Sequence, residues 1–353
     1  MIVEDLLPVL NGLTASVFVI DADRHVLLVN DAGRTLFGDE LVGFDFVQAV
    51  RNPQCLKAIG KVLDGRKKAE TIITLQNPVR TTYQVTVTRL GSKQAETAQE
   101  EKRAIISLEN ISHIYEAELM RSAFVANVSH ELRSPLTSLN GFIETLKGSA
   151  KDDEVARERF LSIMEKEAQR MNRLIGDLLS LSKVEADAHV RPDDLVDLSL
   201  LIQQTLMVFE PLAQKDGVAF SLQIPAEMKT VILGDSDQLQ QVFVNLIENA
   251  IKYGGNDGHV SISISFSERQ HAMGIKGPAI QIDITDTGPG IKAEHISRLT
   301  ERFYRVDKGR SRKKGGTGLG LAIVKHILAR HRGRLQITSE VGKGSTFTVL
   351  IPH

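Results

Sequence analysis

The stretch Asn127-Val128-Ser129-His130-Glu131-Leu132-Arg133-Ser134-Pro135-Leu136 decides the fold of the middle of this chain. It belongs to a pattern of apolar residues spaced by threes and fours, which predicts an amphipathic helix with a nearly heptad period. His130 precedes Leu132 by two positions, so it points roughly 200° away from the apolar stripe and should face solvent. The stripe consists of Val125, Val128, Leu132, Leu136, Leu139, Ile143 and Leu146.

The neighbours of His130 are suited to chemistry at its ring. A neutral imidazole nitrogen can attack a phosphoryl group, and an adjacent carboxylate can orient the ring and take up the proton, which makes Glu131 the candidate base. Ser134 lies one turn further on the same face. Pro135 removes a backbone hydrogen bond to the Glu131 carbonyl and should loosen or kink the helix. Taken alone, His130 would fit a surface histidine on a coiled-coil helix.

Length and composition limit the class of protein. A chain of 353 residues suggests two to three domains. A single cysteine, Cys55, excludes a disulfide framework and fits a reducing compartment. The formal net charge of -1 provides no global field for nucleic acid. No apolar run approaches the ~20 residues that cross a bilayer, and Glu4 and Asp5 argue against a signal peptide.

Residues 1–112 are predicted to form a small α+β module. Short strands are expected at Ser16–Asp21 and Val26–Asn30 around a polar turn. Helical patches should follow, and then later strands at Thr82–Leu90 and Arg103–Ser112. The polar stretch from Gly91 to Lys102 is expected to be a hairpin loop between them.

Residues 113–188 are predicted to form a helical hairpin. One long helix should run from Ile111 to about Lys147, and a second to about Ala186. Two helices joined by a short loop pack antiparallel. Since two such helices bury little by themselves, a four-helix bundle from two chains is expected, and hence a homodimer. The apolar face of the second helix comprises Leu161, Met164, Ala168, Met171, Leu174, Leu178 and Leu181.

Residues 192–353 mix strands and helices without strict alternation, which indicates an α/β sandwich. The expected strands are Val218–Ile224, Val231–Leu233, His259–Phe266, Ala279–Asp286, Leu335–Ser339 and Ser345–Ile351. The expected helices are Leu200–Gln214, Asp237–Lys252, Ala293–Leu299 and Leu319–His331.

The helix at Asp237–Lys252 has two distinct faces. Asn245, Asn249 and Lys252 are spaced by four and three and share one face. Amide oxygens suit Mg²⁺, and Lys252 can neutralise a phosphate oxygen, while Tyr253 can flank a nucleotide. For these residues alone, a solvated polar face would be the simpler interpretation. The core face is expected to contain Leu239, Val242, Phe243, Leu246 and Ala250.

Two glycine-containing segments complete a candidate nucleotide site. A strand of alternating isoleucines ends at Asp286, which can accept a hydrogen bond from an adenine amine, and Gly288 and Gly290 let the backbone turn and approach a ligand. Glycines that run into a helix can form an anion cradle from backbone N–H groups. Those cradle residues are Gly316, Thr317, Gly318, Leu319 and Gly320.

Other nucleotide-binding motifs do not fit. No strand leads into the second glycine run with an acidic residue about twenty positions later, so a Rossmann site is excluded. No Lys-Ser or Lys-Thr follows the glycines, so Walker A is excluded. The basic run from Lys308 to Lys314 either forms a lid over the phosphates or is a solvated loop.

The His130 segment, the Asn245–Tyr253 helix and the glycine segments follow one another along the chain in an order that resembles that of sensor histidine kinases. The His130 segment resembles their phospho-acceptor box. The later segments resemble the nucleotide-binding boxes of the Bergerat (GHKL) fold, which these kinases share with gyrase, Hsp90 and MutL. Phe303-Tyr304-Arg305 matches the F box, and Gly342-Lys343-Gly344-Ser345 the last glycine box. Residues 1–112 resemble a PAS domain, where a small-molecule or protein input would act. Phe124 to His130 is most similar to the phosphate-regulon sensor kinases.

The resemblance implies ATP- and Mg²⁺-dependent autophosphorylation of His130 and transfer to an aspartate of a response regulator of the OmpR/PhoB type. No nucleic-acid partner is expected, because the near-zero net charge provides no field for one. The hydrolysing relatives carry a glutamate where this chain has Asn245, which favours transfer over hydrolysis. Ser134 replaces the usual threonine and keeps a hydroxyl for dephosphorylation of the regulator. The chain would be cytoplasmic, either whole or as part of a membrane-anchored kinase. The alternative is an ATP-binding scaffold that signals through partner contacts.

Overall fold

The computed structural model describes residues 6–38, 40–76, 79–90, 102–225, 228–254, 258–267, 277–307 and 316–353. Contacts within the chain divide it into two compact units, Met1–Ala126 and Asn127–His353. No helix among the described residues combines the length and the apolar character needed to cross a membrane. The expected lid at 308–314 and nearly all of the expected loop at 91–102 lie outside the described residues.

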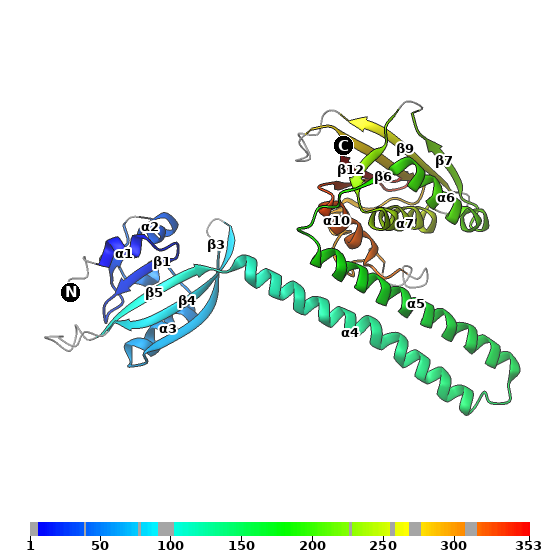
Figure 1. Ribbon diagram of the computed structural model, residues 1–353. Coiled ribbons are helices and arrows are strands. Elements are labelled where there is room, and N and C mark those ends of the chain that lie inside the picture. The colour runs from blue at the N-terminus through cyan, green and yellow to red at the C-terminus, as the bar shows by residue number, and fades with distance from the viewer. Residues whose placement is uncertain are drawn as a thin grey trace. The chain divides into compact units, whose positions relative to one another are not determined.

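The first unit is built around an antiparallel five-stranded sheet in the order β2-β1-β5-β4-β3 (Figure 1). Its strands are β1 (Ser16–Ile20), β2 (Val26–Val29), β3 (Lys68–Gln76), β4 (Arg80–Leu90) and β5 (Arg103–Asn110), and its helices are α1 (Leu7–Asn11), α2 (Asp31–Phe37), η2 (Phe46–Gln48) and α3 (Pro53–Leu63). The sequence did not predict β3, which lay in the region expected to be helical. Of its side chains only Ile73 is buried, so this edge strand has a weak alternation signal.

The core of this unit lies between the sheet and its helices. Phe18 makes edge-to-face contacts with Phe37 and Phe46, at centroid distances of 5.7 and 5.2 Å. Cys55 is fully buried on α3, and burial raises the pKa of its thiol to about 12, so it behaves as a small apolar side chain.

A buried amide ties the front of the unit together. The Asn30 Oδ1 accepts hydrogen bonds from the backbone N–H groups of Val17 and Gly33. Its Nδ2 donates to the carbonyls of Leu10 and Ala15. All four bonding positions of the amide are therefore used, and Asn30 caps α2 while holding α1 and β1 against β2.

The predicted hairpin is confirmed as two long helices, α4 (Ser112–Lys147) and α5 (Glu154–Ala186), which lie antiparallel in Figure 1. The Asp153 carboxylate caps α5 by accepting a hydrogen bond from the Ala156 N–H at 2.8 Å. Near the loop, Phe142 and Phe160 stack with centroids 5.4 Å apart. Pro135 lies inside α4, which continues beyond it as one helix.

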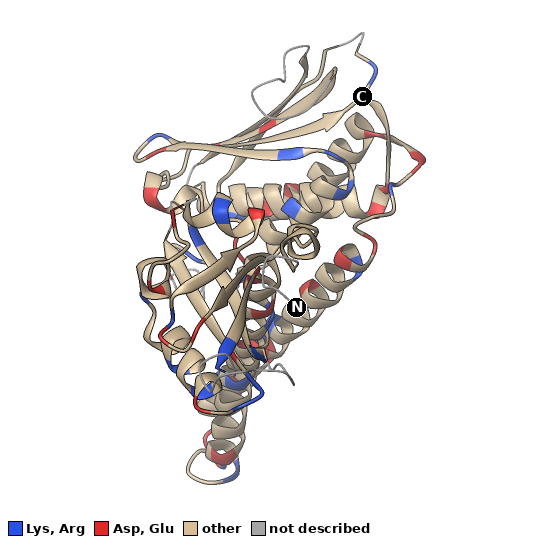
Figure 2. Ribbon diagram, turned by 90° about the vertical axis from the view of Figure 1, so that its left-hand side faces the viewer, with Lys and Arg blue, Asp and Glu red and all other residues tan. Residues whose placement is uncertain are grey.

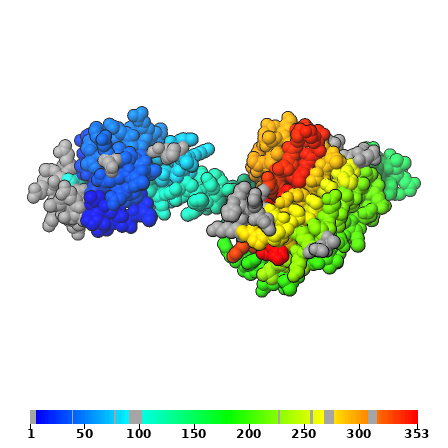
Figure 3. All heavy atoms as spheres, turned by 90° about the horizontal axis from the view of Figure 1, so that it is seen from above, coloured from blue at the N-terminus to red at the C-terminus, as the bar shows by residue number. Residues whose placement is uncertain are grey.

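The remainder of the second unit is a two-layer α/β arrangement, as predicted. Its main sheet has the order β11-β12-β10-β9-β7, and α6, α7 and α10 cover one face of it (Figure 1). The last strand pairs with β10 and β11. In Figure 3 the red C-terminal residues accordingly lie beside residues coloured yellow and orange. The elements are β6 (Asp194–Asp197), α6 (Leu198–Lys215), β7 (Ala219–Gln223), β8 (Val231–Gly234), α7 (Ser236–Tyr253), β9 (His259–Ser267), β10 (Ala279–Asp286), α8 (Ala293–Ile296), α10 (Gly320–Arg330), β11 (Arg334–Glu340) and β12 (Gly344–Pro352).

The sequence did not predict β6, which pairs with β8 in a separate two-stranded sheet. At its end, the Asp197 carboxylate caps α6 and accepts a hydrogen bond from the Thr230 hydroxyl at 2.6 Å. That bond lowers the pKa of Asp197. Basic and acidic residues are interspersed along the ribbon (Figure 2).

Candidate functional site

A cavity of about 630 Å³ lies in the second unit, between α7, the end of β10, the glycine loop before α10, and α5. Most residues predicted to bind a nucleotide meet there, although they come from separate segments of the sequence. Those that line it are Asn245, Asn249, Lys252, Tyr253, Asp286, Gly290, Arg305, Gly316, Thr317, Gly318 and Gly320. Gly288 and Leu319 are not among the residues that line it.

The helix α7 contributes the polar wall. Its predicted core residues are all buried, and this turns Asn245, Asn249 and Lys252 toward the cavity. The Nδ2 of Asn245 is buried and has no hydrogen-bond partner among the described residues. Because an unpaired buried amide is costly, this atom fits a ligand that would supply its partner. The Lys252 ammonium pairs with Glu248 on the preceding turn at 2.8 Å.

Asp286 forms the floor of the cavity at the end of β10. Asp286 is only 4% exposed, and burial raises the pKa of its carboxyl group. Hydrogen bonds from the backbone N–H groups of Gly288 and Ser345 oppose that rise. Gly288 donates to Oδ1 at 2.9 Å. A carboxylate held in this way can accept a hydrogen bond from a ligand amine.

The glycines of the first loop are required by the chain's own backbone. A Cβ on Gly288 would lie 2.2 Å from the Tyr253 carbonyl oxygen, and one on Gly290 would lie 2.1 Å from the Glu340 carbonyl oxygen. These glycines have close neighbours within the protein, the end of α7 and the end of β11, and Gly290 also lines the cavity. They bring Asp286 and Tyr253 together at one wall.

The second glycine loop is held by the F-box segment. The Phe303 N–H donates to the Gly318 carbonyl at 2.8 Å, and Arg305 Nη2 donates to the Thr317 carbonyl at 2.7 Å. Gly318 has φ of +77°, and a Cβ there would meet the Phe303 backbone at 3.0 Å. A Cβ on Gly320 would lie 2.9 Å from Asn245 Oδ1. The loop can thus place the first N–H groups of α10 at the cavity, where an anion would be stabilised.

Sequence reasoning missed the contribution of α5. Arg173 and Asp177 also line the cavity, and the Thr317 hydroxyl donates to Asp177 Oδ2 at 2.6 Å. Burial raises the pKa of Asp177, and the Thr317 hydrogen bond opposes that rise. No sequence signal distinguishes Asp177 from the other polar residues of α5, because its position depends on a contact 140 residues away.

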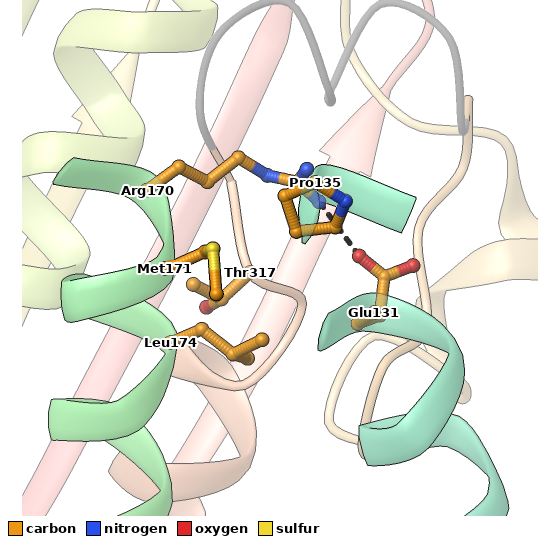
Figure 4. Close-up of a pocket in the computed structure, with 6 residues that line it drawn as sticks. All are labelled: Glu131, Pro135, Arg170, Met171, Leu174 and Thr317. Carbon is orange, nitrogen blue, oxygen red and sulfur yellow. Dashed lines mark hydrogen bonds and ion pairs between the residues drawn. The ribbon is translucent and has the colours of Figure 1, made fainter. Parts of the chain in front are cut away.

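His130 is exposed on α4, as predicted, and it does not line the cavity. Glu131 turns toward α5 and the F-box segment, as Figure 4 shows for its pairing with Arg170. Its Oε2 lies 2.7 Å from Arg170 Nη2 and 3.4 Å from Arg305 Nη2. Ser134 is half-buried one turn away. In this conformation the candidate base and the acceptor ring are therefore directed to different surroundings.

Two family models match the chain from residue 120 onward. Residues 120–187 match the His Kinase A (phospho-acceptor) domain, and residues 234–353 match the histidine kinase-, DNA gyrase B- and HSP90-like ATPase. Across 340 residues, the chain is 34% identical to the phosphate regulon sensor protein PhoR of Pseudomonas aeruginosa, and the match covers 96% of this chain and 72% of that protein.

The chain belongs to the sensor histidine kinase family. It is a protein-histidine kinase that uses ATP. It is also 39% identical over 249 residues to the sensor protein kinase WalK of Staphylococcus aureus, which covers 70% of this chain and 57% of that relative. The crystal structure of histidine kinase ThkA in complex with response regulator protein TrrA shares its fold, with a TM-score of 0.51, 19% identity, and coverage of 96% of this chain and 95% of that one.

Proposed function

We propose that this kinase binds ATP with Mg²⁺ in the cavity, phosphorylates itself on His130 and passes the phosphoryl group to an aspartate of a response regulator. The observation that carries the proposal is the convergence of Asn245, Asn249, Asp286 and the glycine loop on one cavity. The division of labour would follow the predicted domains: an input module at 1–112, a phosphotransfer hairpin at 113–188 and a catalytic domain at 192–353.

Each wall of the cavity has a distinct role in this proposal. Asp286 accepts a hydrogen bond from the adenine amine, and Tyr253 flanks the base. Asn245 and Asn249 supply the amide oxygens for Mg²⁺, and Lys252 faces the phosphates. The bound metal neutralises charge on the phosphates. The remaining nucleotide contacts are assigned to Gly288, Gly290, Arg305, Gly316, Thr317, Gly318, Leu319 and Gly320.

The catalytic domain must move for transfer to occur. His130 lies outside the cavity lining, and the reacting atoms of a phosphoryl transfer must come within about 3–3.5 Å. Glu131 must also leave its arginine partners if it is to orient the His130 ring. The conformation described here is therefore a resting state of the proposed reaction.

The acceptor is tested by replacing His130 with glutamine. The purified full chain is incubated with γ-labelled ATP and Mg²⁺, and the protein-bound label is measured after acid and base treatment. His130→Gln should abolish an acid-labile, base-stable label while ATP binding is retained. Undiminished labelling would show that another residue is the acceptor.

The nucleotide site is tested by calorimetry with Mg-ATP. Asp286→Asn should weaken binding by roughly 1–3 kcal/mol, the cost of losing a hydrogen bond to a charged group. Asn249→Asp should disturb the Mg²⁺ dependence of labelling. If both variants bind as the wild type does, the nucleotide occupies a different place.

A phosphatase activity is proposed for the same helix face. Ser134 lies one turn from His130, and its hydroxyl can orient a water molecule toward the regulator's phosphoaspartate. Ser134→Ala should leave autophosphorylation intact and slow ADP-stimulated dephosphorylation of the regulator. Equal loss of both rates would instead indicate a general disturbance near Pro135.

The biological setting is proposed from the likeness to PhoR. Phosphate-starvation signalling through a regulator of the OmpR/PhoB type, by a homodimeric kinase, is consistent with that likeness. The sheet order of the first unit supports a PAS-type input module. A panel of purified regulators offered to the labelled kinase tests the partner. A chain that binds ATP without labelling would support the scaffold alternative.

A further inference from the structure

A side chain of the phosphotransfer hairpin contacts the glycine loop at the wall of the cavity. Asp177 of α5 accepts the Thr317 hydroxyl hydrogen bond at 2.6 Å, and it lines the cavity beside Arg173. Thr317 belongs to the loop that leads into α10, so this carboxylate lies at the end of the cavity where phosphates would meet backbone N–H groups.

The surroundings of Asp177 already disfavour negative charge. Burial and the nearby Glu248 both raise the pKa of its carboxyl group, whereas the Thr317 hydrogen bond, Lys252 and Arg173 oppose that rise. The phosphates of a nucleotide would add further negative charge at the same place. Like charges within a few ångströms repel strongly in a partly buried site.

The Thr317 contact continues into a chain of polar contacts that reaches the acceptor helix. The Thr317 carbonyl accepts a hydrogen bond from Arg305 Nη2 at 2.7 Å, and the same nitrogen lies 3.4 Å from Glu131 Oε2. Arg170 Nη2 of α5 lies 2.7 Å from the same Glu131 oxygen (Figure 4). One connected set of side chains therefore holds both the glycine loop and the neighbour of His130.

We infer that Asp177 is a latch that the phosphates of the nucleotide displace, which releases the glycine loop from α5 and, through Arg305, frees Glu131. The inference rests on the proposed nucleotide site. It assigns to Asp177 a role opposite to that of a binding residue, because its carboxylate lowers the affinity for phosphorylated ligands while it holds the resting state.

The test measures binding of Mg-ADP and of adenosine to the full chain by calorimetry. Asp177→Ala and Asp177→Asn both remove the charge, and the asparagine keeps the size of the side chain. Both should tighten Mg-ADP binding by about fivefold or more, the lower end of ordinary coupling between sites. Adenosine, which has no phosphates, should bind the variants and the wild type equally.

A matched control removes a carboxylate elsewhere on the same helix. Glu158 is exposed on α5 and does not line the cavity, so Glu158→Ala should leave both affinities unchanged. Circular dichroism verifies that each variant is folded.

The inference is overturned unless both Asp177 variants bind Mg-ADP more tightly than the wild type and the Glu158 control. Weaker binding would make Asp177 a nucleotide- or metal-binding residue. Equal tightening for adenosine would show that the phosphates are not involved. Asp286→Asn in parallel separates the two proposals: if it weakens Mg-ADP binding and the Asp177 variants change nothing, the site stands and the latch fails.

Discussion

At the scale of single residues, Gly290 and Gly342 show two separate reasons for a glycine: a positive φ at both, and a close backbone contact at Gly290. Both have positive φ, +70° and +85°. A Cβ on Gly290 would lie 2.1 Å from the Glu340 carbonyl oxygen, whereas no described atom lies within 4 Å of one on Gly342. Gly342→Ala should therefore cost only the left-handed backbone penalty, about 1–2 kcal/mol.

Gly290→Ala should lower the free energy of unfolding by more than Gly342→Ala, because the backbone near Glu340 must also move. Urea unfolding of the full chain measures both values. Equal losses would mean that the close approach of β11 to this loop is unimportant for stability.

His331 links stability to pH. Its ring is buried, which lowers its pKa below the ordinary 6.5. Nε2 accepts a hydrogen bond from the Asp235 N–H at 3.0 Å, and Nδ1 lies 2.8 Å from the Ile327 carbonyl oxygen, so the neutral ring joins α10 to the start of α7. Protonation of Nε2 would break the hydrogen bond from the Asp235 N–H. The charges of Arg330 and Arg191 also lower the pKa of the ring, and the charge of Asp235 raises it.

Since the folded pKa is lowered, the unfolded chain binds more protons, and stability rises with pH across this range. The contribution of His331 should be complete above pH 6.5 and decline as the pH falls through that value toward the lowered folded pKa. His331→Gln should reduce stability at alkaline pH and flatten the slope of stability against pH below about 6.5. An unchanged slope would show that another group titrates.

At the scale of elements, Arg330 fastens the segment after α5 to the catalytic domain. From the end of α10, its Nε donates to the carbonyls of Asp187 and Val190, and its Nη1 lies 3.1 Å from Asp235 Oδ2. Its side chain is only 9% exposed, so its removal would leave two backbone carbonyls and the Asp235 carboxylate without this hydrogen-bond donor.

Arg330→Met should destabilise the second unit by roughly 1–3 kcal/mol, as expected for lost hydrogen bonds to a charged group. Lys325→Met is the matched control, because Lys325 is exposed on the same helix and loses the same charge. Thermal unfolding of both variants provides the comparison. Equal shifts would show that charge, and not the contact with the segment after α5, is responsible.

At the scale of the whole molecule, α4 leaves apolar side chains in solvent. Val125, Leu136 and Ile143 belong to the predicted stripe and are 57%, 52% and 38% exposed in a single chain. A second copy would cover them in a four-helix bundle. Light scattering at micromolar concentration should therefore give twice the chain mass of 38.9 kDa.

Leu136→Glu should shift that mass toward the monomer, because it places a charge in the stripe. Thr137→Glu adds the same charge one position away, outside the stripe, and should remain dimeric. A wild-type chain that scatters as a stable, fully helical monomer would contradict the bundle.

Local patterns determined most of the elements. The apolar period predicted both long helices, and the core face of α7 proved to be buried residue by residue. The strand that ends at Asp286 was predicted with its observed bounds. These features depend on residues that are close in sequence, so the periods of a helix and a strand reveal them. The edge strand β3 was not predicted because only one of its residues is buried, so its sequence does not alternate clearly between apolar and polar residues.

Only the tertiary structure decided which residues far apart in the sequence come into contact. Asp177 is hydrogen-bonded at the cavity to Thr317, which is 140 positions away in the sequence, and Glu131 contacts Arg305, which is 174 positions away. Gly288 and Gly290 proved to be necessary for the packing of their own backbone. A periodic pattern tells which face of an element is apolar but not which distant polar group lies opposite it. That choice is made by the packing of whole elements, which buries the apolar faces together and brings the remaining polar groups into contact.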